Sequence, residues 1–358
     1  KLLSDKETLL RGEGGFIYPF TPQHVLSNRS LVTVDGARAT RQLSGSADLM
    51  VLGASMGEGV RSVDLYGTEP LSEGWTRIIP HDSDNEMNLA GNIMAALELR
   101  LLAQVRADHV LIDGAYLGNA SSVIFGLLSM KPRQITFLTE LNHDSYLQQG
   151  LVEVLSASQG GSRDFLKYIA VTKSDSSYVQ SKKLFGQEAG SSIPDRVVAS
   201  HFLRPGEFML PRPVEPTPPL LKDLESKLGS TKPEVQRMLN GVLGWLKDFG
   251  GSWDRTMPNR LYTAYFKPSR WSSIDRALKV EFVYHEDSPK TLLEHTADVV
   301  TIVDDDMVES GIMEPYSNYI ADVNAKQVSQ AMDIVETALQ GFAETAEEAT
   351  SILRSYRT

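Results

Sequence analysis

Two short apolar segments that each end in Asp-Gly constrain the fold of this chain more than any other feature. They run from Leu31 to Gly36 and from Val110 to Gly114. Apolar runs rich in β-branched residues are typical of buried strands, and an Asp-Gly pair is typical of a turn. We therefore expect two core strands, each of which carries a carboxylate, Asp35 or Asp113, where the chain turns away.

The segment between these strands carries a third acidic residue. Apolar residues recur at helical spacing from Glu86 to Arg106, and Glu98 borders the apolar stripe of that helix. Three carboxylates that converged there would be destabilised by burial and mutual repulsion, and a divalent cation would remove that cost. Oxygen ligands favour Mg²⁺ or Mn²⁺ over zinc. An ordinary turn explains either Asp-Gly alone, whereas the set of three acids favours a metal site.

Composition and missing motifs exclude other kinds of site. The chain has no cysteine, so it has neither disulfides nor a thiolate metal site, and its seven histidines are scattered. The formal net charge of -11 argues against a surface that coats nucleic acid by bulk electrostatics, although basic residues can still gather in one groove. No Gly-x-x-x-x-Gly-Lys-Ser/Thr loop is present, so the chain is not itself a P-loop ATPase.

The order of the elements predicts an α/β fold with a mixed sheet flanked by helices. Residues 47–55 and 59–66 are strand-like, with a turn at 57–59, and they extend the first strand into an antiparallel meander. The acidic helix and a second Asp-Gly strand, parallel to the first, complete the pattern of a ribonuclease H-like fold. Further strands are expected at 168–172 and, as edge or outer strands, at 261–266 and 277–284.

Prolines mark the main interruption of this pattern. Those between residues 205 and 219 predict an extended connector, followed by a helical insertion. We therefore divide the chain into an N-terminal segment, 1–29, a ribonuclease H-like core, 30–204 and 260–358, and the connector with its insertion, 205–259. Within the first segment, the aromatic run 16–20 is expected to be a strand over the core, with an exposed docking patch as the alternative.

Two absences bear on location. No segment approaches the roughly 20 apolar residues of a membrane span, and the first 15 residues lack the apolar core of a signal peptide. The sequence therefore predicts a cytoplasmic protein that has no contact with a membrane.

In their order and spacing, these residues resemble the NurA nucleases, which work beside the hexameric DNA motor HerA in DNA end processing. The resemblance covers about residues 30 to 330, and it rests on the segments 34–36, 111–114, 168–174 and 315–326 and on Glu98 in its helix. It implies a Mn²⁺-dependent deoxyribonuclease, with Mg²⁺ as the alternative metal, that acts on DNA ends and single strands as an exonuclease and endonuclease. It also implies a homodimer, a HerA-like ATPase as partner, and a role in DNA repair or in defence against foreign DNA.

The resemblance assigns roles to individual residues. Asp35 and Asp113 would be direct or bridging metal ligands, and Glu98 would hold a metal or its water. Lys173 would meet a phosphate oxygen as a point charge. The cleavage of a phosphodiester would therefore depend on these four side chains.

Two more lysines follow Lys173 in a basic stretch of the chain. Lys182 and Lys183 are expected to bind the DNA backbone through a short helix that begins after a Ser/Asp-rich turn. A solvated turn is the alternative interpretation of all three lysines.

The late motif departs from the NurA pattern at two positions. A tyrosine usually precedes the proline there and a histidine ends the segment, whereas this chain has Glu314 and Asp322. Asp322 is either a fourth carboxylate ligand or the N-cap of the helix that follows. An aspartate cannot donate a proton at pH 7 unless its pKa is raised, so the departure leaves the cleavage mode open. The earlier run 304–306, three adjacent aspartates, is expected to be a solvated loop.

Two other classes of function compete with a nuclease. A catalytically silent adaptor that clamps DNA or loads a motor would keep the acids only for folding, and an assay of metal binding and cleavage separates it from a nuclease. A phosphotransferase of the sugar-kinase type needs two related halves with glycine-rich phosphate loops, and the chain shows no such duplication.

Overall fold

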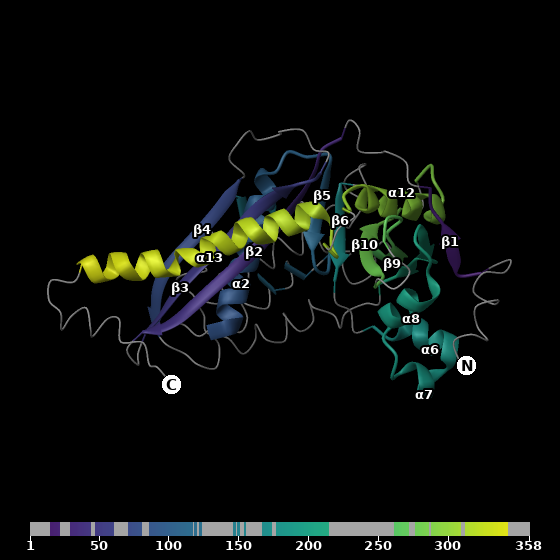
Figure 1. Cartoon of the computed structure of the whole chain (residues 1–358), viewed down its shortest axis with the longest axis horizontal. Helices are drawn as coiled ribbons and strands as arrows, with labels where there is room; N and C mark the ends of the chain where they lie inside the picture. Colours follow the sequence, from purple (N-terminus) through teal and green to yellow (C-terminus); the bar gives the residue numbers. More distant parts are fainter. Residues whose placement is uncertain are drawn as a thin grey trace, which may run out of the picture.

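One mixed sheet organises the described part of the chain. Its strands have the order β1-β7-β9-β10-β6-β5-β2-β3-β4, with β8 paired to β9. The predicted combination of antiparallel and parallel strands flanked by helices is therefore confirmed (Figure 1). The computed structural model describes residues 15–21, 29–43, 47–60, 71–80, 86–116, 118–119, 122–123, 146–147, 149–150, 154, 167–173, 177–214, 261–271, 276–285, 288–308 and 312–342.

The predicted meander is present, but its strands are longer than expected. It consists of β2 (Leu31–Leu43), β3 (Ala47–Glu58) and β4 (Ser72–Pro80), which pair antiparallel in that order. β4 is the third strand, and residues 61–66 of the strand predicted at 59–66 lie outside the described residues.

Two turns predicted from glycines in this meander are wrong. β2 continues through Gly36, and β3 continues through Gly57. A Cβ at Gly57 would stand 2.1 Å from the carbonyl oxygen of Ser317, so the glycine lets a helix approach the strand closely. Close packing, rather than a change of chain direction, explains glycine at this position.

The parallel part of the sheet is as predicted. β5 (His109–Asp113) lies between β2 and β6 (Tyr168–Thr172) and is parallel to both. β10 (Leu278–Val283) follows β6, and β9 (Leu261–Lys267) follows β10, both antiparallel.

β9 and β10 are interior strands, so their prediction as edge strands is wrong. Both lysines of these strands have partners. Lys267 donates a hydrogen bond of 2.8 Å to the carbonyl oxygen of Ser200, and Lys279 lies 2.9 Å from a carboxylate oxygen of Glu281. Polar side chains that find partners can occupy the middle of a sheet.

The sheet also includes residues from the predicted N-terminal segment and connector. β1 (Ile17–Pro19) is the strand expected in the aromatic run, and it pairs with β7 (Glu207–Met209). β7 and β8 (Arg212–Pro213) come from the proline-rich stretch and pair with β9. Residues 215–260, which hold the predicted helical insertion, lie outside the described residues.

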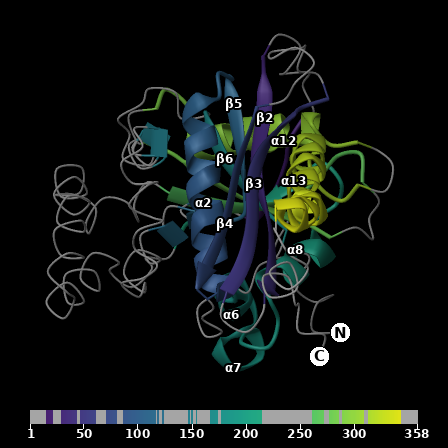
Figure 2. The same cartoon turned by 90° about the vertical axis from the view of Figure 1, so that its left-hand side faces the viewer.

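Two long helices cover opposite faces of β2 and β3. α2 (Glu86–Gln104) packs on one face and α13 (Tyr316–Phe342) on the other (Figure 2). α2 buries its apolar side in a core with β2, β3 and β5, whereas α12 (Leu292–Asp305) shares a second core with β6 and β10. No helix in the described ranges is both long and apolar enough to cross a membrane.

The three adjacent aspartates end α12 and are buried, so the predicted solvated loop is wrong. Asp304 accepts hydrogen bonds of 2.6 Å from the backbone and the hydroxyl of Ser269. Asp306 accepts bonds of 2.9 Å from the backbone N–H groups of Val60 and Ser317. Asp306 thereby supplies an acceptor to the first turn of α13, whose N–H groups have no partner within the helix.

Three short helices form a separate group. They are α6 (Val179–Phe185), α7 (Gln187–Gly190) and α8 (Asp195–Phe202). α6 is the short helix predicted to carry the two consecutive lysines.

Candidate functional site

Two of the predicted acids lie side by side where parallel strands diverge. Val34 pairs with Ile112, so Asp35 and Asp113 follow at neighbouring positions. β5 ends at Asp113, because Gly114 adopts a φ of 99° that favours glycine and turns the chain. β2 instead continues without a partner strand on this side in the described part of the chain. The carboxyl ends of parallel strands are a common location for binding sites.

Glu98 reaches the same place from α2. Its side chain is buried against Gly36, where an added Cβ would stand 2.3 Å from its Oε1 atom. Gly36 does not have a positive φ, so this position needs glycine for space. Asn119 donates a hydrogen bond to the Glu98 carboxylate.

Two of the three acids, Asp35 and Glu98, have a raised pKa. Burial, followed by the charge of Asp113, raises the pKa of Asp35 to about 7, although the amide of Gly36 and the charge of Lys173 oppose this rise. Burial and then the charge of Asp35 raise the pKa of Glu98 well above its ordinary value. Such effects require the carboxylates to lie near one another. Asp35, Glu98 and Asp113 therefore lie near one another, and their role as metal ligands stays a prediction.

α13 adds the fourth predicted acid. Because α13 begins at Tyr316, Asp322 lies in its second turn, and the alternative role as an N-cap is wrong. Its charge contributes to the raised pKa of Asp35, and its carboxylate lies 2.5 Å from the ammonium group of Lys326. One turn earlier, Asn318 donates a 3.4 Å hydrogen bond to Asp113.

Of the three predicted DNA-binding lysines, only Lys173 lies at the acids. Its ammonium group is 3.1 Å from Oδ2 of Asp113 and also pairs with Glu314. Burial alone would lower the pKa of Lys173, but these two carboxylates outweigh it and raise the pKa. Lys182 and Lys183 lie on α6, apart from the ends of β2 and β5 (Figure 1).

Four residues that contact the predicted site residues were not predicted from the sequence: three contact an acid, and Glu314 contacts Lys173. Glu314 was noted only as a departure from a motif, although it pairs with Lys173. Lys326 follows Asp322 at the i,i+4 spacing of a helical ion pair, which is a signal that could have identified it. Asn119 and Asn318 give no signal in the sequence, because only the fold brings them to Glu98 and Asp113.

The donor atoms suit a hard cation, although their present spacing does not. In the ranges that the structure describes, no three His, Asp or Glu side chains form a group that could hold a metal ion. Instead, Lys173 pairs with Asp113 and Glu314, and Lys326 pairs with Asp322. A set of carboxylate oxygens around the buried Glu98 nevertheless offers the ligand atoms that Mg²⁺ and Mn²⁺ prefer.

Comparison with solved structures identifies the fold. A crystal structure of NurA matches with a TM-score of 0.53 and 10% sequence identity, over 97% of this chain and 96% of that chain. This chain has the NurA fold. A crystal structure of NurA with manganese matches with a TM-score of 0.50 and 11% identity, over 96% of each chain. No family model and no curated protein matches.

Proposed function

We propose that this chain is a metal-dependent deoxyribonuclease that cleaves DNA ends and single strands. The observation that carries the proposal is the convergence of Asp35, Glu98 and Asp113 at diverging strand ends, in the fold of NurA. A NurA structure contains manganese, which supports Mn²⁺ as the cofactor, with Mg²⁺ as the alternative. Carboxylates that lie close together destabilise a folded protein, so such a group favours a functional role.

In this proposal each acidic side chain has a separate role. Asp35, Asp113 and Asp322 would hold the metal, and Glu98 would hold a metal or its water. When bound, the metal would orient a water for attack on the phosphodiester and stabilise the charge on the leaving oxygen. Burial, and then the charge of Asp35, raise the pKa of Glu98, and an opposing cation would favour its charged form.

The lysine at this site would position the substrate. Lys173 extends from the end of β6, and two carboxylates fix its ammonium group beside Asp113. A point charge held there would meet a phosphate oxygen of a DNA strand that lies across the acids. Lys182 and Lys183 are proposed to contact the same strand farther along, at α6.

We further propose a homodimer that works with a HerA-like hexameric ATPase in DNA repair or in defence against foreign DNA. The NurA fold supports this partnership. The chain has no P-loop motif, so processive movement along a duplex would need an ATPase supplied by another protein. Co-expression with a HerA-like ATPase from the same organism should give a stable complex and ATP-stimulated degradation of duplex DNA. Separate elution of the two proteins and an activity indifferent to ATP would contradict the partnership.

A second candidate function is a DNA-clamping or motor-loading adaptor without catalysis. The ion pairs of Lys173 and Lys326 favour it, because they offset part of the negative charge of Asp113, Glu314 and Asp322 without a metal. An adaptor of this kind would bind DNA whether or not a divalent metal is present. The two candidates therefore differ in a property that can be measured directly.

Cleavage of labelled DNA by the purified chain separates the two functions. We expect end-labelled single-stranded and duplex DNA to be cut in Mn²⁺ and left intact in EDTA. Asp113→Asn should abolish most cleavage, because it removes one charge from the metal site. Asp298→Asn is a matched control. Asp298 lies on α12 and forms an ion pair with Lys290, which precedes that helix, rather than with a residue of the candidate site. DNA binding without cleavage in any metal would favour the adaptor.

A further inference from the structure

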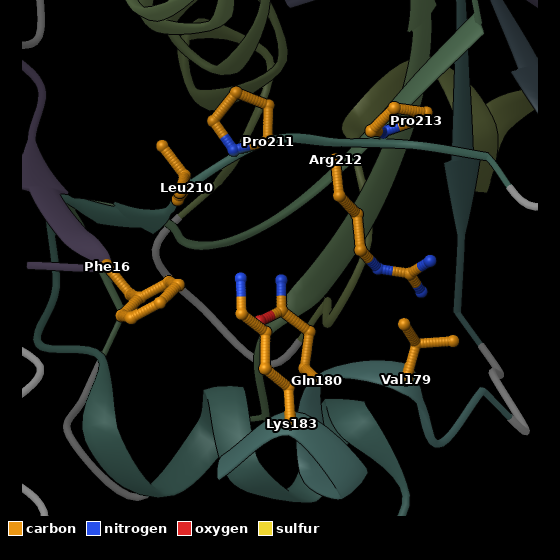
Figure 3. A pocket seen from close by; sticks show the side chains of 8 residues that line it. All are labelled: Phe16, Val179, Gln180, Lys183, Leu210, Pro211, Arg212 and Pro213. Carbon is orange, nitrogen blue, oxygen red and sulfur yellow. The ribbon is translucent and has the colours of Figure 1, made fainter. Parts of the chain in front are cut away.

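A pocket lies between α6 and β8, apart from the acids. Its volume is about 270 Å³. Figure 3 shows the side chains that line it, which come from α6, from the segment 210–213 and from Phe16 just before β1. Pockets for drug-sized ligands are about 300 Å³ or larger, so this one suits a smaller group, such as a single nucleotide.

Two polar side chains line this pocket, and one of them has a buried atom without a hydrogen-bond partner among the described residues. Gln180 is only 5% exposed, and its amide points into the pocket (Figure 3). The Nε atom of Arg212 is buried and has no partner. The far end of that guanidinium is fixed, because it donates to Ser177 at 2.7 Å and to Asp195 at 3.3 Å. Buried polar groups usually have a protein, water or ligand partner, so unpaired ones that line a pocket indicate a ligand.

The other lining groups define the chemistry of that ligand. The ammonium group of Lys183 lies 4.7 Å from the centroid of the Phe16 ring, at one side of the pocket. Leu210 and Pro211 provide apolar surface. The N–H groups of Gln180, Arg212 and Lys183 favour a ligand that is rich in acceptors and carries negative charge. A nucleotide combines a flat ring, base-edge acceptors and a phosphate, and aromatic side chains bind bases by stacking.

We propose that this pocket binds one nucleotide of a single DNA strand whose neighbouring phosphates lie at Lys173. The base would lie against Phe16 and Pro211, with the Gln180 amide at its edge and Lys183 at its phosphate. Lys173 and Val179 are six residues apart, so their Cα atoms are at most roughly 22 Å apart. The strand would reach the pocket within a few nucleotides of the acids. This inference rests on the proposed function, because the strand bound in the pocket is the DNA strand that the acids would cut.

An abasic scan of a short oligonucleotide tests the pocket in the unmodified protein. Binding of a labelled single-stranded 12-mer is measured in EDTA, where no cleavage is expected, with one base removed at each position in turn. We expect one position at which removal of the base weakens binding by about tenfold. A scan that is flat at every position would overturn the proposal. Cleavage in Mn²⁺ is measured separately, so a flat scan with normal cleavage refutes only the pocket.

Two variants then locate the effect. Gln180→Ala should weaken binding of the intact 12-mer and should remove the response to the abasic position. Gln187→Ala is the matched control, because Gln187 is exposed on α7 and does not line the pocket. Thermal unfolding of both variants shows whether they are folded. Equal binding by the two variants, or an abasic response that survives in folded Gln180→Ala, would contradict the assignment. Base-dependent binding without any cleavage would retain the pocket and refute the nuclease.

Discussion

Replacement of Asp322 by Asn tests the place where this chain departs from the NurA pattern. With the N-cap role excluded, the remaining structural role of Asp322 is an i,i+4 ion pair with Lys326. The side chain of Lys326 is 62% exposed and that of Asp322 is 29% exposed. Exposed helical ion pairs contribute about 0.3–0.5 kcal/mol, so Asp322→Asn should change the free energy of unfolding by no more than that.

A metal ligand would give a much larger effect on the reaction. Asn keeps the size of Asp but removes one negative charge from the acids, so Mn²⁺ binding should weaken. We expect cleavage to slow by tenfold or more, which corresponds to about 1.4 kcal/mol in the activation barrier. The change in rate would therefore exceed the change in stability, and the two can be separated.

The assay is the cleavage rate as a function of Mn²⁺ concentration for Asp322→Asn. Asp333→Asn is the matched control, because Asp333 is also on α13 and pairs with Arg41 at 3.4 Å, but its side chain is 83% exposed and it does not lie at the acids. Urea unfolding of both variants checks the stability argument. A Mn²⁺ curve for Asp322→Asn that matches the control would refute the assignment of Asp322 to the site.

Three further predictions follow from single contacts. Gly36→Ala would place a Cβ 2.3 Å from Glu98 Oε1 and 2.6 Å from Met94 Cγ. It should therefore displace Glu98, abolish most cleavage and lower the free energy of unfolding in urea by about 1–3 kcal/mol. Normal cleavage would contradict this. Lys173→Ala should reduce the slope of log binding constant against log salt concentration for single-stranded DNA by roughly one unit, and an unchanged slope would support a structural lysine. Burial raises the pKa of Asp306 to about 6 from an ordinary 3.8, so the native state binds more protons than the unfolded state between those values. Stability should therefore fall by about 2 kcal/mol as pH rises from 4 to 6.5, and urea unfolding of Asp306→Asn should lack that part of the slope. Parallel pH curves for the two proteins would refute it.

The sequence by itself determined the elements of the parallel core. β5 and β6 are short apolar runs, and their boundaries follow from composition alone. The helical spacing of apolar residues in α2 placed Glu98 at the edge of its buried face. Periodicity shows which side of an element faces the core, and here that was enough to predict that Asp35, Glu98 and Asp113 converge.

The tertiary structure decided what each residue faces. Gly36 and Gly57 have the local signature of turns, yet Glu98 and α13 pack directly against them. The buried Asp306 binds N–H groups at Val60 and Ser317, which are distant from it in the sequence. The sequence allowed Asp322 to be a helix N-cap, but α13 begins at Tyr316, which excludes that role. Composition and spacing describe a residue and its neighbours along the chain, whereas the roles of these residues depend on atoms that long-range packing brings to them.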